Sequence, residues 1–150
     1  MVLLSGPEPQ RTILEEKLLK ELENFKGSVL FVKGTVEEDQ KISEKGNMII
    51  YNFMTSELLE KALNESEYVL SRSGYTTIMD LAKLNKKAFF IPTPGQFEQE
   101  YLAKRLTELD IVPSCPQDEF TVDKLKGLSR YKGFESYDHE VDFKKLFSLF

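Results

Sequence analysis

The chain has 150 residues, about the size of a single domain with one hydrophobic core. Its formal charge of −5 argues against a nucleic-acid binder, because affinity for a phosphate backbone depends on clustered lysine and arginine. Its 41% hydrophobic residues are ordinary for a globular domain, and no apolar run approaches the roughly 20 residues that a membrane helix needs.

Two residue types limit the chemistry of the chain. Cys115 is the only cysteine and His139 the only histidine, which excludes an internal disulfide, a cysteine-rich zinc site and a histidine pair for a metal. A Ser/His/Asp triad would have to use His139, for which a solvated surface position is the simpler interpretation. No signal peptide is visible, because Ser5-Gly6-Pro7 interrupts the apolar start. We therefore expect a cytoplasmic protein without a metal.

Short β-branched and aromatic runs alternate with segments of helical periodicity, the pattern of βα units around a mostly parallel sheet. The predicted strands are Val2–Ser5, Ser28–Lys33, Met48–Asn52, Tyr68–Ser71, Ala88–Ile91 and Ile111–Pro113. The predicted helices are Gln10–Phe25, Ser56–Asn64, Thr76–Leu84 and Phe97–Leu109. We expect a Rossmann-like, doubly wound α/β domain of about six strands with helices on both faces.

Three segments have further expectations. The first helix is expected to bury an apolar stripe, formed by Ile13, Leu14, Leu18, Leu22 and Phe25. The polar stretch Lys33–Asn47 is interpreted as a solvated connection with room for one short helix. Residues 117–150 are predicted to be a helical extension that ends in an amphipathic helix over Val141–Phe150. We favour packing of its apolar face on this domain over docking to another domain or a membrane surface.

The turn after the first strand lies where doubly wound folds bind phosphate. It spans Leu4–Thr12 and holds one glycine, two prolines and Glu8, whereas a phosphate loop uses several glycines and no acid. Arg11 and Thr12 are placed to donate from the start of the helix. A rigid, proline-capped helix start explains the same residues, so both interpretations stay open.

The turn between the fourth predicted strand and its helix is a stronger candidate for an anion site. Gly74 allows close backbone approach, and a helix N-terminus presents free amides and the positive end of its dipole. The hydroxyls of Ser73, Thr76 and Thr77 add donors. Asp80 lies one turn further along the same helix and is placed to accept from sugar hydroxyls. A phosphate beside a ribose indicates a nucleotide, while an ordinary N-cap is the simpler alternative.

A second polar turn follows the fifth predicted strand at the same edge of the sheet. Gln96, Gln99 and Glu100 stand at the start of its helix, and such amides and carboxylates pair with vicinal sugar hydroxyls. Taken alone, they are equally explained as a polar first helix turn. Arg72, at the end of the neighbouring strand, is interpreted as structural and paired with a carboxylate at the strand ends.

These residues together resemble a known family. The resemblance rests on three runs, Arg72-Ser73-Gly74-x-x-Thr77-x-x-Asp80-Leu81-Ala82, Ile91-Pro92 and Gln96-x-x-Gln99-x-x-x-Ala103. They are similar to the donor-binding half of GT-B glycosyltransferases of family 28, the family of peptidoglycan N-acetylglucosaminyltransferases. The resemblance covers the core of the chain and the order of its elements. It implies that residues 1–150 form one nucleotide-sugar-binding domain of a bacterial hexosyltransferase.

The resemblance implies roles for individual residues. The Ser73–Thr77 turn would bind the diphosphate of a UDP-sugar, and Asp80 would hold the ribose hydroxyls where the family uses glutamate. Gln99 and Glu100 would reach the donor sugar. A glycine-rich loop that the family has after its first strand is replaced here by Ser5-Gly6-Pro7-Glu8-Pro9.

The resemblance also implies what the chain works with. Backbone groups near Phe53 and Met54 would read the uracil of the donor. The acceptor-binding N-terminal domain, which in this family supplies the candidate general base, is absent from the sequence. The isolated chain should therefore bind nucleotide and transfer little or no sugar. The full enzyme would use a UDP-sugar without cofactor or metal, and peripheral association with the inner face of the membrane fits its family.

Two alternatives stay open. In the first, the chain is a natural subunit of a split two-chain glycosyltransferase rather than a truncated enzyme. In the second, from a different class, it is a non-catalytic, flavodoxin-like α/β module that binds partners through its acidic surface and C-terminal helix. Binding of UDP separates these classes.

Overall fold

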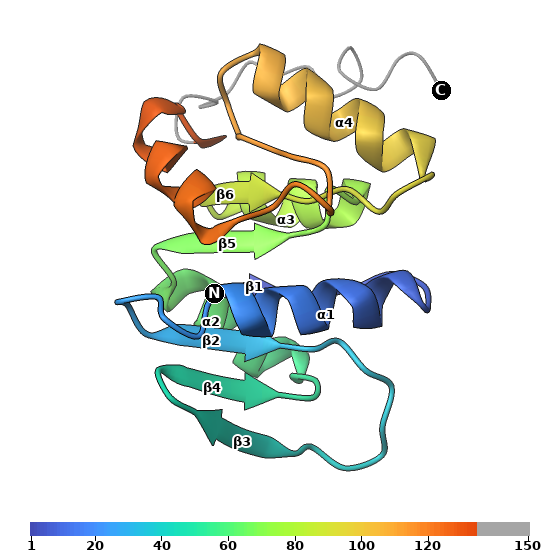
Figure 1. Ribbon diagram of the computed structural model, residues 1–150, viewed down its shortest axis with the longest axis vertical. Helices are drawn as coiled ribbons and strands as arrows, with labels where there is room; N and C mark the ends of the chain where they lie inside the picture. The colour runs from blue at the N-terminus through green and yellow to red at the C-terminus, as the bar shows by residue number, and fades with distance from the viewer. Residues whose placement is uncertain (135–150) are drawn as a thin grey trace.

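The protein is described by a computed structural model that covers residues 1–134. Figure 1 shows a single sheet with helices on both of its faces. The prediction of a Rossmann-like α/β domain is therefore confirmed. The predicted helix over Val141–Phe150 and the only histidine, His139, lie outside the described residues.

The sheet has six strands in the order β3-β4-β2-β1-β5-β6. They are β1 (Val2–Leu3), β2 (Val29–Val32), β3 (Ile42–Lys45), β4 (Met48–Tyr51), β5 (Tyr68–Ser71) and β6 (Lys87–Phe90). All pairs are parallel except β3 with β4. The chain leaves β1 toward β2 and β4 and then returns to the other side of β1 with β5. The strand order thus reverses between β1 and β5, the switch point at which such sheets leave a crevice at their carboxyl ends.

Helices flank the sheet on both sides. Within residues 1–134 they are α1 (Gln10–Glu21), α2 (Ser56–Glu65), α3 (Tyr75–Lys83), α4 (Phe97–Glu108) and the 3-10 helix η1 (Val122–Arg130). In Figure 1, α1 lies in front of the sheet, α2 and α3 lie behind it, and α4 lies beyond β6. The predicted extension after residue 116 is represented, as far as residue 134, by η1.

The sheet separates two apolar clusters, because alternate side chains of a strand point to opposite faces. Leu14, Leu18 and Leu22 of the first helix segment pack in one cluster with Phe31 of β2. The predicted stripe is wrong for Ile13 and Phe25, which are 45% and 38% exposed. Helix α1 ends at Glu21, so Phe25 falls in the turn that follows it, and Ile13 lies about 100° around the helix from Leu14.

The polar stretch before β4 forms a strand rather than the short helix that its composition allowed. Residues 42–45 make β3, an antiparallel edge strand joined to β4 by the two-residue turn Gly46-Asn47. Gly46 has φ +60°, as the tight turns of β-hairpins require. The strand was missed because all four of its residues are exposed and show no alternation of apolar and polar types.

The predicted strand Ile111–Pro113 is also wrong. Only an isolated bridge between Phe90 and Ser114 continues the sheet beyond β6. Pro113 accepts from the Phe90 amide at 3.0 Å but has no amide of its own, so the segment cannot build a ladder of hydrogen bonds. Ile111 and Val112 are buried in the second cluster, which explains their strand-like composition.

Gly34 lies two residues after β2, where the backbone of Leu4 leaves no room for a side chain. It has φ +67°, and a Cβ added there would lie 2.2 Å from the carbonyl oxygen of Leu4. We expect Gly34→Ala to lower the free energy of unfolding by about 2 kcal/mol, since backbone must move to admit the methyl group. Gly46→Ala is the matched control, with a similar φ and no atom within 4 Å, and should cost about 1 kcal/mol. Urea unfolding of both variants measures the difference, and equal losses would contradict a steric role for Gly34.

Candidate functional site at the carboxyl edge of the sheet

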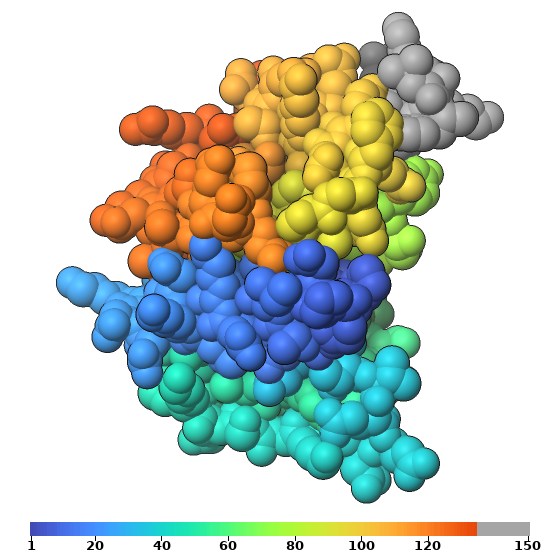
Figure 2. Space-filling model, turned by 45° about the vertical axis from the view of Figure 1, so that its right-hand side comes forward, coloured from blue at the N-terminus to red at the C-terminus, as the bar shows by residue number. Residues whose placement is uncertain are grey.

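The parallel strands bring five loops to one edge of the sheet. These loops follow β1, β2, β4, β5 and β6, and the β1 and β5 loops flank the switch point. Figure 2 turns this edge toward the reader, with the blue β1–α1 segment lying between the yellow loop after β6 and the cyan loop after β2. Most of the residues predicted from the sequence therefore lie along one edge, as the topology requires.

The donors at the start of α1 are already hydrogen-bonded to carboxylates of the protein. Arg11 donates to Glu8 Oε1 and to Glu15 Oε2, each at 2.7 Å, and the Thr12 amide donates to Glu8 Oε2 at 3.2 Å. Hydrogen bonds from Thr12 and Arg11 lower the pKa of Glu8, which therefore caps the helix as a carboxylate. Arg11 is thus already paired with two carboxylates. The arrangement favours the proline-capped helix start over a phosphate loop at this position.

The start of α3 is open by contrast. Its N-cap residue is Gly74, which has no side chain to cap the helix. The carbonyl of Gly74 accepts from the amide of Ile78 at 3.0 Å. Among the described residues, nothing accepts from the amides of Thr76 and Thr77. A Cβ at Gly74 would meet only Thr77 Oγ1, at 4.0 Å. Amides without a described partner, two hydroxyls and an unobstructed approach are the features with which a helix start can receive an anion, so this turn stays the candidate site.

Asp80 lies one turn further along α3 and is exposed. Thr76 is exposed and Thr77 half-buried on the same helix. The structure thus keeps the predicted juxtaposition of a carboxylate with hydroxyls and free amides.

Ser73 has a different position from the other hydroxyl residues of the turn. It is 0% exposed, and its Oγ donates to the carbonyl oxygen of Gln99 at 2.7 Å. Its side chain therefore joins the β5–α3 turn to α4. The burial covers the backbone of Ser73 as well, so its predicted contact with the diphosphate stays a prediction.

The polar residues at the start of α4 brace their own loop. Gln99 Oε1 accepts from the Thr93 amide at 2.9 Å, and Gln99 Nε2 donates to Gln96 Oε1 at 2.6 Å. Glu100 Oε1 accepts from the Gly95 amide at 2.9 Å. These hydrogen bonds fix the loop after β6, beside the candidate site, in place of a side-chain N-cap. Contacts with a sugar stay a prediction for Gln96, Gln99 and Glu100.

The loop after β4, predicted to read uracil, is organised by a buried asparagine. Asn52 is 6% exposed, and its Oδ1 accepts from the amides of Lys41 at 2.7 Å and Phe53 at 2.9 Å. Gln40 Nε2 donates to the carbonyl of Phe53 at 3.0 Å. Both backbone groups of Phe53 are therefore engaged, which leaves the backbone of Met54 as the better candidate for a base contact. At about 4.8 Å per strand, this loop lies about 14 Å from the β5 loop.

Arg72 is the most buried charged side chain of the site, at 1% exposed. One terminal nitrogen donates to the carbonyls of Ile91 at 3.1 Å and Pro92 at 3.0 Å. The other donates to the carbonyl of Gln10 at 2.9 Å and to Gln117 Oε1 at 2.6 Å. The predicted pairing with a carboxylate is wrong, because the strand ends offer carbonyls and an amide instead. The structural role is right, since one guanidinium ties together four segments of the edge.

Sequence reasoning missed three residues of this edge. Gln117 is 6% exposed and bonds both Arg72 and, through Nε2 at 3.0 Å, Gln10 Oε1. Thr93 is 2% exposed, and no described residue bonds its hydroxyl. Asn52 organises the β4 loop as described above. No local pattern marks them, because each depends on a neighbour that is distant in the sequence or on burial.

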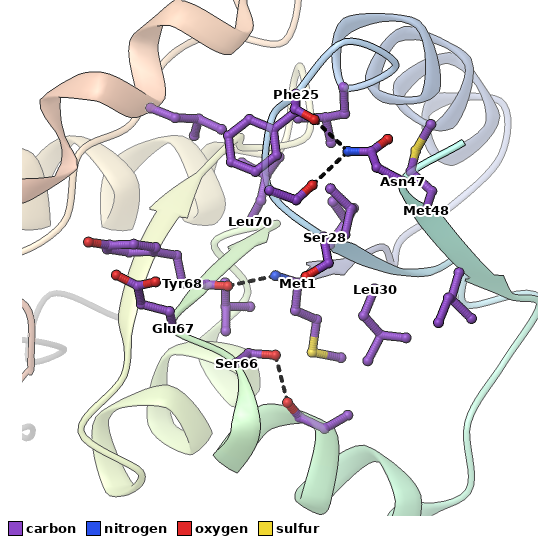
Figure 3. Close-up of a pocket in the computed structure, with 18 of the residues that line it drawn as sticks. Met1, Phe25, Ser28, Leu30, Asn47, Met48, Ser66, Glu67, Tyr68 and Leu70 are labelled. Atoms are coloured by element: carbon purple, nitrogen blue, oxygen red, sulfur yellow. Dashed lines mark hydrogen bonds between the residues drawn. The ribbon is translucent and has the colours of Figure 1, made fainter. Parts of the chain in front are cut away.

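The broad hollow shown in Figure 3 lies at the opposite edge of the sheet. It surrounds Met1, whose amine donates to the Tyr68 carbonyl at 2.8 Å, and it reaches Asn47 and Phe25. It contains none of the predicted phosphate or sugar residues.

Other chemistries find little support in residues 1–134. In that range no three His, Cys, Asp or Glu side chains gather in a way that could hold a metal. No helix there is long and apolar enough to cross a membrane. Burial raises the pKa of Cys115 to about 11, so its thiol is protonated at neutral pH and is not poised as a nucleophile.

A family model and curated proteins that match the chain both describe glycosyltransferases. The model of the glycosyltransferase family 28 C-terminal domain matches residues 10–129. The chain is 35% identical over 69 residues to the UDP-N-acetylglucosamine--N-acetylmuramyl-(pentapeptide) pyrophosphoryl-undecaprenol N-acetylglucosamine transferase of Bradyrhizobium diazoefficiens, over 45% of this chain and 19% of that protein. The protein of the same name from Pasteurella multocida is 30% identical over 95 residues, 62% of this chain and 26% of the relative. The matches span about a fifth to a quarter of these relatives.

Solved structures agree on the fold. The crystal structure of Acinetobacter baumannii MurG has a TM-score of 0.66 at 17% identity, over 99% of this chain and 48% of that one. The solution structure of ALG13 has a TM-score of 0.62 at 15% identity, over 89% of this chain and 87% of that one. At these identities the likeness establishes a shared Rossmann-like architecture.

Proposed function

The chain belongs to the glycosyltransferase family 28 C-terminal domain family, as its sequence resemblance implied, and we propose that it is the UDP-sugar-binding half of such an enzyme. The observation that carries this proposal is the open start of α3. At the switch point, where the start of α1 is already bonded to Glu8, it is the start of α3 that combines amides without a described partner with an exposed Thr76 and a half-buried Thr77. Family membership disfavours the alternative of a non-catalytic module.

The proposed reaction is transfer of a hexosyl group, with N-acetylhexosamine as one candidate because the curated relatives are N-acetylglucosamine transferases. The acceptor oxygen forms a bond to the anomeric carbon, and the bond from that carbon to the diphosphate oxygen breaks. The acceptor proton passes to a base supplied by the acceptor-binding wall. Negative charge grows on the leaving diphosphate, which the N-terminus of α3 stabilises through its amides and dipole.

The remaining predicted contacts orient the donor. Asp80 accepts from the ribose hydroxyls, and the backbone of Met54, next to the already bonded backbone of Phe53, contacts the base. The ligand lies across the ends of β2 and β1 between these two groups. Gln96, Gln99 and Glu100 line the sugar end of the site.

The acceptor-binding wall is a second part of the active site. We propose an N-terminal domain of the same polypeptide, because the chain spans only a fraction of the curated relatives that it matches. A separate subunit is the second candidate, favoured by the extent of the ALG13 chain, of which the match covers 87% and which covers 89% of this chain. In either case the chain by itself should bind UDP without transferring sugar. Cytoplasmic location and peripheral association with a membrane stay predictions.

Titration of the full chain with UDP tests the proposal. We expect amide chemical shifts to move at Gly74, Thr76, Thr77 and Asp80 and to stay unchanged at Ser28 and Asn47, which line the hollow at the opposite edge. Absence of any shift at millimolar UDP would contradict the proposal, as would shifts confined to that hollow.

A pair of glycine variants sharpens the test. Gly74→Val places a side chain where the phosphate approaches, and Gly127→Val places one in open space in η1. Neither glycine has a positive φ, so both variants should fold. The Gly74 variant should lose UDP binding and the Gly127 variant should keep it.

A further inference from the structure

Arg72 is a buried cation without a buried anion to balance it. Arg72 is 1% exposed, and its guanidinium donates four hydrogen bonds, three to backbone carbonyls and one to Gln117 Oε1. No carboxylate of the described residues forms an ion pair with it, whereas Arg11 nearby pairs with both Glu8 and Glu15. Burial lowers the pKa of Arg72 to about 10, so the side chain remains charged at neutral pH.

The surroundings of Arg72 contain more donors than acceptors. Arg72 Nε has no partner among the described residues, and neither does the buried hydroxyl of Thr93. Thr93 directly follows Pro92, whose carbonyl Arg72 bonds. The hydroxyl also lies 3.6 Å from the position that a Cβ on Gly6 would take, in the loop after β1. Of the two unpartnered groups, Arg72 Nε therefore belongs to the turn before α3, and the Thr93 hydroxyl belongs to the neighbouring loop after β6.

A charge in this position acts over a distance. Inside a protein the effective dielectric constant is far below that of water, so an unbalanced buried charge is felt several ångströms away. Arg72 precedes Gly74 by two residues, and its head group bonds the first residue of α1 and the start of the loop after β6. A dianionic diphosphate at Gly74–Thr77 would lie within the field of this cation, and an uncharged ligand would gain nothing from it.

We propose that Arg72 is the electrostatic selector of the donor site, a buried cation that favours nucleoside diphosphate over uncharged nucleoside without contacting either. This inference rests on the proposed function and extends it, since it gives the buried charge of Arg72 a role at the donor site. The same side chain also holds the loops together, so it is a positioning residue with an electrostatic effect.

Gln117→Glu is the sharpest test, because it supplies the missing anion without enlarging the side chain. Gln117 Oε1 is 2.6 Å from the Arg72 guanidinium, so the carboxylate would neutralise the cation in place. We expect UDP affinity to fall about tenfold and uridine affinity to stay unchanged, as measured by titration of the full chain with each ligand. Asn24→Asp adds the same charge at the exposed, opposite edge of the sheet and should leave both affinities as they are.

The outcomes separate this inference from the proposed function. If the original chain binds UDP and Gln117→Glu keeps its preference for UDP over uridine, the selector role is wrong and the donor site stands. Equal losses for UDP and uridine would show a purely structural role and likewise overturn it. If the original chain binds no UDP, both proposals fall together. Should Gln117→Glu not fold, Arg72→Lys, which keeps the charge, must keep the UDP preference.

Discussion

Replacing Asp80 by alanine should lower the affinity of the chain for UDP by about ten- to a hundredfold. A carboxylate that accepts from two ribose hydroxyls makes charge-assisted hydrogen bonds, and losing them costs about 1.5–3 kcal/mol. Asp80 is exposed on α3, so the substitution should leave the stability of the fold nearly unchanged. Calorimetric titration with UDP measures the first effect, and urea unfolding measures the second.

The ribose contact has its own control. Asp80→Glu restores the residue that the family uses and should bind UDP within a few-fold of the original chain. 2′-Deoxy-UDP lacks one of the two hydroxyls, so the original chain should bind it more weakly than UDP, and Asp80→Ala should show no such difference. An alanine variant that still prefers UDP over its deoxy analogue would contradict the role given to Asp80.

Replacing Arg72 by methionine should destabilise the fold more than any other single change considered above, by about 3–4 kcal/mol. The change leaves four buried acceptors, 2.6–3.1 Å from the guanidinium nitrogens, without a donor. Each lost hydrogen bond contributes about 1 kcal/mol or more to the stability. Removing a buried charge also removes its desolvation cost, which keeps the loss below the sum of the four bonds. Urea unfolding measures the change in free energy.

Arg105→Met is the matched control for this prediction. Arg105 is exposed on α4 and lies 3.9 Å from Glu108, so its loss should change the stability by about 0.5 kcal/mol or less. A similar small effect for Arg72→Met would show that the carbonyls at the strand ends do not depend on the guanidinium. The role of Arg72 as the tie between the loops would then be wrong.

The architecture could be predicted from the sequence because its signals are local. Runs such as Val69-Leu70-Ser71 and Ala88-Phe89-Phe90 are short, apolar and flanked by helical periodicity, which defines βα units whatever they pack against. The failures have the opposite character. The β3 strand is polar and stabilised by its pairing with β4, while Ile111–Pro113 looks like a strand because it is buried.

The candidate site was partly predictable for the same reason. A glycine and hydroxyls before a helix, followed by Asp80, form a local pattern that places an anion site at the start of α3. The sequence favoured this turn over the turn after β1, where it left both a phosphate loop and a proline-capped helix start open. The hydrogen bonds of Glu8 with Arg11 and Thr12 closed one helix start, and the lack of a cap left the other open.

By itself, the sequence determined the α/β class, the order of the elements and the family, because all three depend on patterns within about thirty residues. The tertiary structure decided which polar side chains face outward. Ser73 and Arg72 stand within the same motif as Thr77, yet both are buried and bonded to segments 19 to 62 residues away. A hydroxyl or a guanidinium binds whichever acceptor the fold brings near, and only the packed chain establishes whether that acceptor is protein or ligand.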